Sequence, residues 1–112
     1  AADALAKLLE SLPELPLLVV STDMHHYSDD AATRKLDAEA LEAIRGLDSR
    51  QLWDTVRRRG IKMCGYRPTV LVMETLRRLG KLNCCEQVGY ATSADASGDT
   101  REVVGYAGLL WN

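Results

Sequence analysis

Residues 17–27, Leu-Leu-Val-Val-Ser-Thr-Asp-Met-His-His-Tyr, join a short apolar run directly to a polar cluster. The run Leu17–Val20 has no polar alternation, which is typical of a β-strand covered on both faces. Both histidines of the protein, His25 and His26, follow it together with Asp23. Ligands of open α/β sheets bind just beyond the carboxyl ends of the strands. This stretch therefore predicts both a strand and a site at the end of it.

The rest of the chain is predicted from hydrophobic periodicity and from helix-end signals. Helices are expected over residues 2–12, 31–46, 49–59 and 68–79, and strands over residues 82–91 and 102–111. Residues 92–101 are rich in Ser, Ala, Gly and Asp, the composition of a turn. The resulting order, α-β-α-α-α-β-β, predicts a protein of the α/β class.

The 112 residues are enough for one domain with a real core. The predicted sheet is nevertheless small, and its strands at 17–20 and 103–110 are apolar on both faces. Three strands also leave edges open to pairing with another chain. We therefore expect the sheet of this single, partial domain to be completed by a missing segment or by another chain, including a second copy of this one.

Composition and charge narrow the class of partner. The net charge of −2 gives no electrostatic reason to expect nucleic acid. The clusters Arg57–Arg59 and Arg77–Arg78 fall in last helical turns, where cations oppose the negative end of the helix dipole; a phosphate-binding patch is the less favoured alternative. The sequence has no apolar stretch that could span a bilayer and no signal-peptide pattern. Three cysteines without a disulfide spacing indicate reduced thiols, and we expect a cytoplasmic protein.

The adjacent histidines His25 and His26 point in different directions on an extended backbone, so they cannot be assumed to share a metal. One of them, with Asp23 near its other ring nitrogen, would form a general acid/base of fixed tautomer. The alternative is a surface pair of histidines without a role. Tyr27 either holds a substrate oxygen or simply packs.

Cys64 lies in a loop between helices and precedes Gly65, which permits close approach of the backbone. A thiolate there would bind a soft or borderline metal, or act as a nucleophile, if a neighbouring cation such as Arg67 lowered its pKa. The alternative is an inert buried cysteine. Asp95 is a weaker candidate for a polar contact at the site.

Four segments together resemble the MEMO-like family, also called AmmeMemoRadiSam system protein B. Residues 20–27 are similar to the family's SSDLSHY segment and residues 63–68 to CGYGP. Residues 90–99 are similar to YATSGDVSGD, and residues 103–107 match VVGYA. The resemblance covers nearly the whole chain, but only the C-terminal part of the family's domain.

The MEMO-like family resembles the class III extradiol ring-cleaving dioxygenases, which are non-haem iron enzymes of α/β fold. The resemblance implies that Cys64 is a metal ligand in place of a carboxylate and that His26 occupies the acid/base position. Asp23, Tyr27, Arg67 and Asp95 would then line the pocket. Two further histidine ligands belong to the family's N-terminal half and have no counterpart here, so iron or copper is not expected to be bound by this chain alone.

Three residues depart from the family pattern. His25 replaces a small residue, Arg67 replaces a glycine and Ala94 replaces the glycine of the TSGD element. Arg67 would bring a positive charge near the cysteine, which would favour the thiolate and obstruct a cation.

The resemblance implies the C-terminal portion of a dioxygenase-related metalloprotein. Its metal site would be completed elsewhere, and a redox or dioxygenase-like activity would arise only with the N-terminal half present. One alternative is a non-enzymatic protein-interaction module. Another is a degenerate half-domain that assembles with a partner chain.

Overall fold

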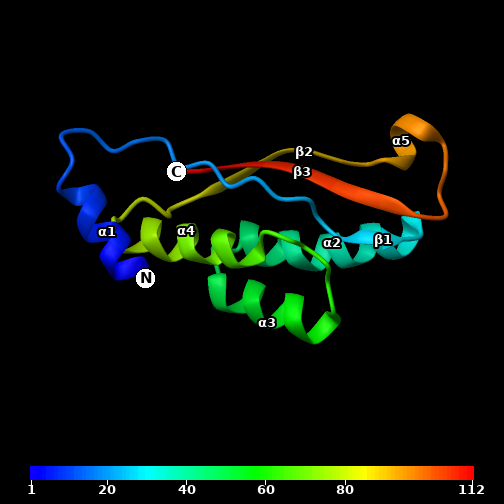
Figure 1. Ribbon diagram of the computed structural model, residues 1–112, viewed down its shortest axis with the longest axis horizontal. Coiled ribbons are helices and arrows are strands. Elements are labelled where there is room, and N and C mark those ends of the chain that lie inside the picture. The colour runs from blue at the N-terminus through cyan, green and yellow to red at the C-terminus, as the bar shows by residue number, and fades with distance from the viewer.

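The computed structural model describes residues 1–112 and places a small sheet against the helices (Figure 1). The elements are α1 (Ala2–Glu10), β1 (His26–Ser28), α2 (Asp30–Arg45), α3 (Ser49–Arg59), α4 (Tyr66–Arg78), β2 (Cys85–Thr92), α5 (Ala94–Ser97) and β3 (Val103–Trp111). The α/β class and the predicted order of elements are confirmed. The one addition is α5, a four-residue helix inside the stretch predicted as a turn.

The sheet is antiparallel and open, with strand order β1-β3-β2. β3 pairs with β2 along most of its length, with Cys85 opposite Trp111 and Thr92 opposite Gly105. β1 pairs only briefly with the other edge of β3, through His26 and Ser28. The short strand β1 therefore fixes the histidine segment against the centre of the sheet.

The four predicted helices begin and end within about two residues of their predicted bounds. The Asp29 side chain accepts a hydrogen bond from the Ala32 amide and caps α2, and Asp48 does the same for α3 through the Gln51 amide. Gly60 ends α3 in the left-handed region, φ 63°, which glycine adopts without steric cost. Local signals thus account for the helix boundaries that lead into the loop of Cys64.

The main core lies among α2, α3, α4 and the loops around them. α2 packs against β2 and β3, and α3 packs against α2 and α4 on the side away from the sheet (Figure 1). Leu52 and Met73 are fully buried where these helices meet. Met24 and Met63, from the two loops that carry the predicted site residues, belong to the same cluster. The core therefore anchors both loops.

The prediction of a buried strand over Leu17–Val20 is wrong. These residues form no strand and connect α1 to β1, with Leu17 88% and Val19 77% exposed. A buried strand needs a hydrogen-bonded neighbour and cover on both faces. β1 occupies that edge of β3 only at Val103 and Val104, but the outward side chains Leu17 and Val19 have nothing to cover them. The first strand instead begins at His26, inside the predicted site.

The far face of the sheet has no helix over it (Figure 1). Val88 and Leu110 are 61% and 60% exposed there. No helix of the chain has the length and apolar character to cross a membrane.

Candidate functional site

The two predicted polar clusters meet through Thr22. Its Oγ1 lies 3.4 Å from the Cys64 Sγ, although 42 residues separate them in the chain. The Gly65 amide donates to the same oxygen at 2.7 Å. A Cβ on residue 65 would fall 2.5 Å from the Thr22 Cβ, so only glycine allows this approach. The contact brings together two loops whose convergence the sequence suggested only through the family resemblance.

Cys64 is exposed, and the pKa of its thiol is lowered. The largest cause is the hydrogen bond with Thr22, followed by a backbone hydrogen bond at Asp23, whereas partial burial and the Asp23 carboxylate oppose them. The expected help from Arg67 is absent among these causes. Cys64 is therefore an accessible thiol whose thiolate form is favoured, and the prediction of an inert buried cysteine does not apply.

His25 ties the same two loops together from inside the protein. Its side chain is buried, and its Nδ1 accepts a hydrogen bond from the Lys62 amide at 2.9 Å. Because an amide can only donate, the proton of the neutral ring is on Nε2, which donates to Ser28 Oγ at 2.8 Å. Burial is the largest cause of its lowered pKa. His25 is thus a buried, neutral support rather than a surface residue.

His26 opens β1 and is half-buried. Its Nδ1 lies 3.2 Å from the Met24 carbonyl oxygen, which can only accept, so Nδ1 carries the proton and Nε2 is left as an acceptor. The expectation that Asp23 would orient a histidine is wrong, because the Met24 carbonyl fixes this tautomer. Asp23 is exposed and hydrogen-bonds to neither imidazole. Tyr27 is 68% exposed and lies edge-on to the His26 ring.

Arg67 and Asp95 have partners away from the Thr22–Cys64 contact. Arg67 donates from Nε to Tyr66 Oη at 3.2 Å. Asp95 accepts from Arg34 at 3.0 Å and from the Thr92 amide at 2.9 Å. These two partners lie near the start of α2 and at the end of β2. Asp95 therefore stabilises the junction of those elements and does not contact Cys64.

Sequence reasoning missed Asp37, which is fully buried. Its Oδ1 accepts from the His25 amide at 2.7 Å, and its Oδ2 accepts from the Tyr90 hydroxyl at 2.5 Å. A Cβ on Gly105 would fall 1.8 Å from Oδ2. Burial raises the pKa of Asp37, the first cause of the shift. The signal was available, because Asp37 shares the apolar face of α2 with Ala40 at i+3.

The residues present do not form a complete metal site. No group of three or more His, Cys, Asp or Glu side chains lies close enough together to hold an ion. The Cys64 thiolate suits one coordination position of iron or copper. The donor chemistry therefore fits a single ligand, and the remaining ligands would have to come from other polypeptide.

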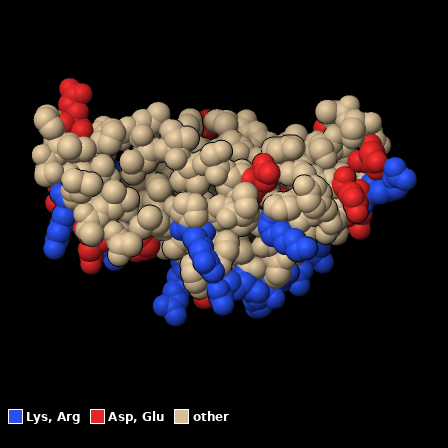
Figure 2. Space-filling view, in the orientation of Figure 1, with Lys and Arg blue, Asp and Glu red and all other residues tan.

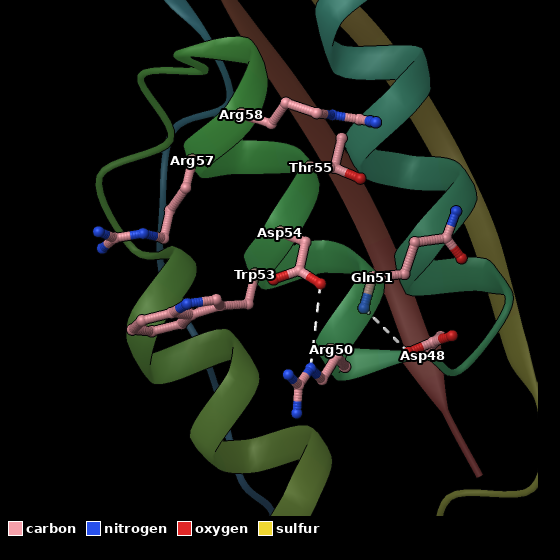
Figure 3. A pocket seen from close by; sticks show the side chains of 8 residues that line it. All are labelled: Asp48, Arg50, Gln51, Trp53, Asp54, Thr55, Arg57 and Arg58. Carbon is pink, nitrogen blue, oxygen red and sulfur yellow. Dashed lines mark hydrogen bonds and ion pairs between the residues drawn. The ribbon is translucent and has the colours of Figure 1, made fainter.

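An apolar groove of about 230 Å³ begins beside this site. Its two polar lining residues are Thr22 and Thr69, and the Leu17–Val20 run and the end of β3 line most of the rest. A larger hollow of about 870 Å³ lies along the outer side of α3, away from the thiol. Figure 3 shows its side chains spreading from α3 in several directions, so they do not enclose a site.

Comparison with known proteins gives the family. A model of the Memo-like protein family matches residues 1–110. The chain belongs to the Memo-like family. A MEMO1 family protein of Thermotoga maritima is 43% identical over 97% of this chain, and one of Methanopyrus kandleri is 33% identical over 97%. These alignments cover 37% and 38% of the two relatives, so the chain spans little more than a third of their length.

Proposed function

We propose that this chain supplies one ligand, the Cys64 thiolate, and one proton-transfer group, the His26 imidazole, to an iron or copper site that other polypeptide completes. The contact between Thr22 and Cys64 carries the proposal, because it joins the histidine loop to the cysteine loop. A metal bound there would supply redox chemistry to the assembled protein. That protein would be a metal-dependent oxidoreductase related to the ring-cleaving dioxygenases.

The surroundings of Cys64 support its role as a ligand. A cysteine must be deprotonated to bind a metal, and the hydrogen bond with Thr22 lowers the pKa of the thiol. The side chain is exposed, so a second polypeptide can reach it. Because such a thiol must remain reduced, we also propose that the protein works in the cytoplasm.

The tautomer of His26 supports its role in proton transfer. With Nδ1–H held by the Met24 carbonyl, Nε2 is free to accept a proton from a bound molecule and to return it later. The backbone of His26 is fixed by its pairing with Val104 of β3. The ring is therefore held by a strand rather than by a free loop.

The apolar groove supports a partner. Leu17 and Val19 are largely exposed although both are large and hydrophobic. The relatives are much longer than the matched region. We therefore propose that polypeptide equivalent to their unmatched part, in the same protein or as a second chain, covers the groove and brings the missing ligands.

A non-enzymatic interaction module is the second candidate, because the same apolar groove could hold a partner without any metal. In that case a chelator would leave the affinity for the partner unchanged. Affinity that falls when the metal is removed would contradict this second candidate.

Metal analysis of an assembled complex tests the proposal. We would co-express the chain with the unmatched part of the Thermotoga maritima relative and measure iron and copper in the purified complex. We expect about one metal per complex for the wild type and for His26→Ala, and loss of metal for Cys64→Ser. Cys84→Ser is the matched control, since Cys84 is also an exposed thiol. Metal retained in Cys64→Ser would overturn the assignment of the ligand.

A further inference from the structure

Asp37 is a buried carboxylate that the proposed metal chemistry leaves unused. Figure 2 shows charged side chains on the outside of the molecule, whereas the side chain of Asp37 is fully buried. Burying such a group costs free energy unless partners satisfy it. Oδ1 accepts from the His25 amide at 2.7 Å, and Oδ2 accepts from the Tyr90 hydroxyl at 2.5 Å. One oxygen is therefore bonded to backbone next to His26.

The amide that Asp37 binds belongs to the peptide between Met24 and His25. This peptide is trans, so its N–H and its carbonyl point in opposite directions. The N–H points to the Asp37 carboxylate, and the carbonyl oxygen lies 3.2 Å from Nδ1 of His26. A single peptide therefore joins the buried carboxylate to the imidazole whose tautomer the Met24 carbonyl fixes.

Strand β3 holds the same segment through the two flanking peptides. The Gly105 amide donates to the His25 carbonyl at 3.1 Å, and the Gly105 carbonyl accepts from the Met24 amide at 2.9 Å. Neither bond uses the N–H or the carbonyl of the Met24–His25 peptide. The partner of its N–H is Asp37, for which the missing side chain of Gly105 leaves room. The direction of the Met24 carbonyl therefore depends on Asp37.

We propose that Asp37 is a positioning residue for His26 and acts through the Met24–His25 peptide. Its hydrogen bond sets the direction of the Met24 carbonyl and, by polarising the peptide, makes that carbonyl a stronger acceptor. The carbonyl keeps the proton of neutral His26 on Nδ1 and leaves Nε2 to accept a proton. The inference rests on the proposed proton-transfer role of His26, because that role requires an unprotonated Nε2.

The tautomer of His26, measured in the chain by itself, tests the proposal. NMR that correlates the ring protons and nitrogens of labelled histidine shows which nitrogen is protonated, at pH about 8, where the imidazoles are neutral. We expect Nδ1–H for His26 and Nε2–H for His25, with His26→Gln identifying the signals. Asp37→Leu should lower the ratio of Nδ1–H to Nε2–H in His26 about fivefold, the effect of losing one hydrogen bond. His25 should keep its proton on Nε2, because its own ring partners remain.

Two matched variants separate the acceptor from its surroundings. Asp37→Asn keeps an oxygen that can accept from the His25 amide, so it should retain the wild-type ratio. Tyr90→Phe removes the partner of Oδ2 but leaves Oδ1 on the peptide, so it should lose stability and still retain the ratio. If Asp37→Leu does not fold, Asp37→Leu in the Tyr90→Phe background replaces it, because the Tyr90 hydroxyl is then not left unpaired.

Four results would overturn the proposal: Nε2–H for His26 in the wild type, an unchanged ratio in Asp37→Leu, a lowered ratio in Asp37→Asn, or loss of the preferred tautomer at both histidines. The last would mean that Asp37 only keeps the loop folded. The measurement needs no metal, and Cys64→Ser should keep the wild-type ratio. Failure of the metal proposal would appear instead as metal retained by the Cys64→Ser complex, so the two failures are distinguishable.

Discussion

The two halves of one short stretch behave differently. Residues 17–20 have no regular structure, and their outer side chains are exposed. Residues 22–28 are held by distant groups, namely the Gly65 and Lys62 amides and the Asp37 carboxylate. The first half is the more hydrophobic, yet the second half is the more firmly fixed. Hydrophobic character therefore orders a segment only where the fold supplies something to cover it.

Gly105→Ala is expected to have the largest effect on the network that holds residues 22–28. The added methyl group overlaps the buried Asp37 carboxylate, so Asp37 must move away from Tyr90 and the His25 amide. We expect a loss of about 4 kcal/mol in the free energy of unfolding, from overpacking together with broken buried hydrogen bonds. Urea unfolding measures it.

Gly89→Ala is the control on the open side of the sheet. A Cβ at Gly89 meets no atom within 4 Å. We expect a change of about 0.5 kcal/mol or less. Equal losses in the two variants would mean that Gly105 does not touch a rigid network.

His25→Ala removes the support between the two loops. The Lys62 amide and Ser28 lose their partner, and a buried ring leaves a cavity. We expect a loss of about 2–3 kcal/mol. We also expect faster reaction of Cys64 with a thiol reagent, since its loop opens more readily; an unchanged rate would show that the loop is held without His25.

Thr22→Val tests the contact between the clusters with little change of shape. It leaves the Gly65 amide without its acceptor and removes the hydrogen bond that lowers the pKa of Cys64. We expect a loss of about 1–2 kcal/mol and a higher thiol pKa in an absorbance titration of the thiolate. Thr22→Ser keeps the hydroxyl and should retain the low pKa; if it behaves like valine, the hydroxyl is not the cause.

The buried histidine gives a pH dependence of definite sign. Because the folded-state pKa of His25 lies below its ordinary value, the unfolded chain binds the proton first as the pH falls. The contribution of neutral His25 to the free energy of unfolding is complete above about pH 6.5. It is lost as the pH falls toward the folded pKa, by at most about 1.4 kcal/mol per pH unit. His25→Gln should flatten urea midpoints measured between about pH 7 and 5.

Asp37 acts with the opposite sign. Its raised pKa means that the folded protein binds the proton more readily than the unfolded chain. The contribution of Asp37 to the free energy of unfolding therefore grows as the pH falls from the folded pKa toward the unfolded one. Asp37→Asn should therefore change the stability profile in the acid range, whereas the slope due to His25 should persist. Loss of that slope in Asp37→Asn would show that the two groups titrate as a unit.

The smallest effect is expected at the open end of the stretch. Leu17→Ser should change the stability of the chain alone by about 0.5 kcal/mol or less, because the side chain is 88% exposed. In the co-expressed complex the same change should weaken association if this run is covered there. Unchanged association would contradict the proposed partner surface.

Prediction from the sequence succeeded where structure depends on nearby residues. Approximate helix bounds followed from local helix-end signals. The structure places Asp29, Asp48 and Gly60 at these ends, and their effects reach only a few residues along the chain. The predicted order of elements rests on the same local periodicity. The prediction for residues 17–20 failed because an apolar run indicates only that burial would be favourable, not whether the fold supplies cover on both faces.

The contact between the two candidate segments was predicted in part. Residue types and the family resemblance singled out the histidine and cysteine segments, which the structure brings into contact, whereas the different surroundings of His25 and His26 could not be predicted. Adjacent residues of the same type differ here only in what surrounds them: Lys62 and Ser28 for one, the Met24 carbonyl for the other. Such partners lie up to 37 residues away, beyond the reach of local patterns.

The sequence by itself determined the α/β class, the order of elements, the approximate helix bounds and the family of this protein. These depend on hydrophobic periodicity, on capping groups and on short motifs, all of which are local. Only the tertiary structure decided that Thr22 meets Cys64, that Asp37 is buried beneath Gly105, and that Leu17 and Val19 remain uncovered. The physical reason is that hydrogen bonds between loops and the burial of a face depend on which distant segments the chain brings into contact.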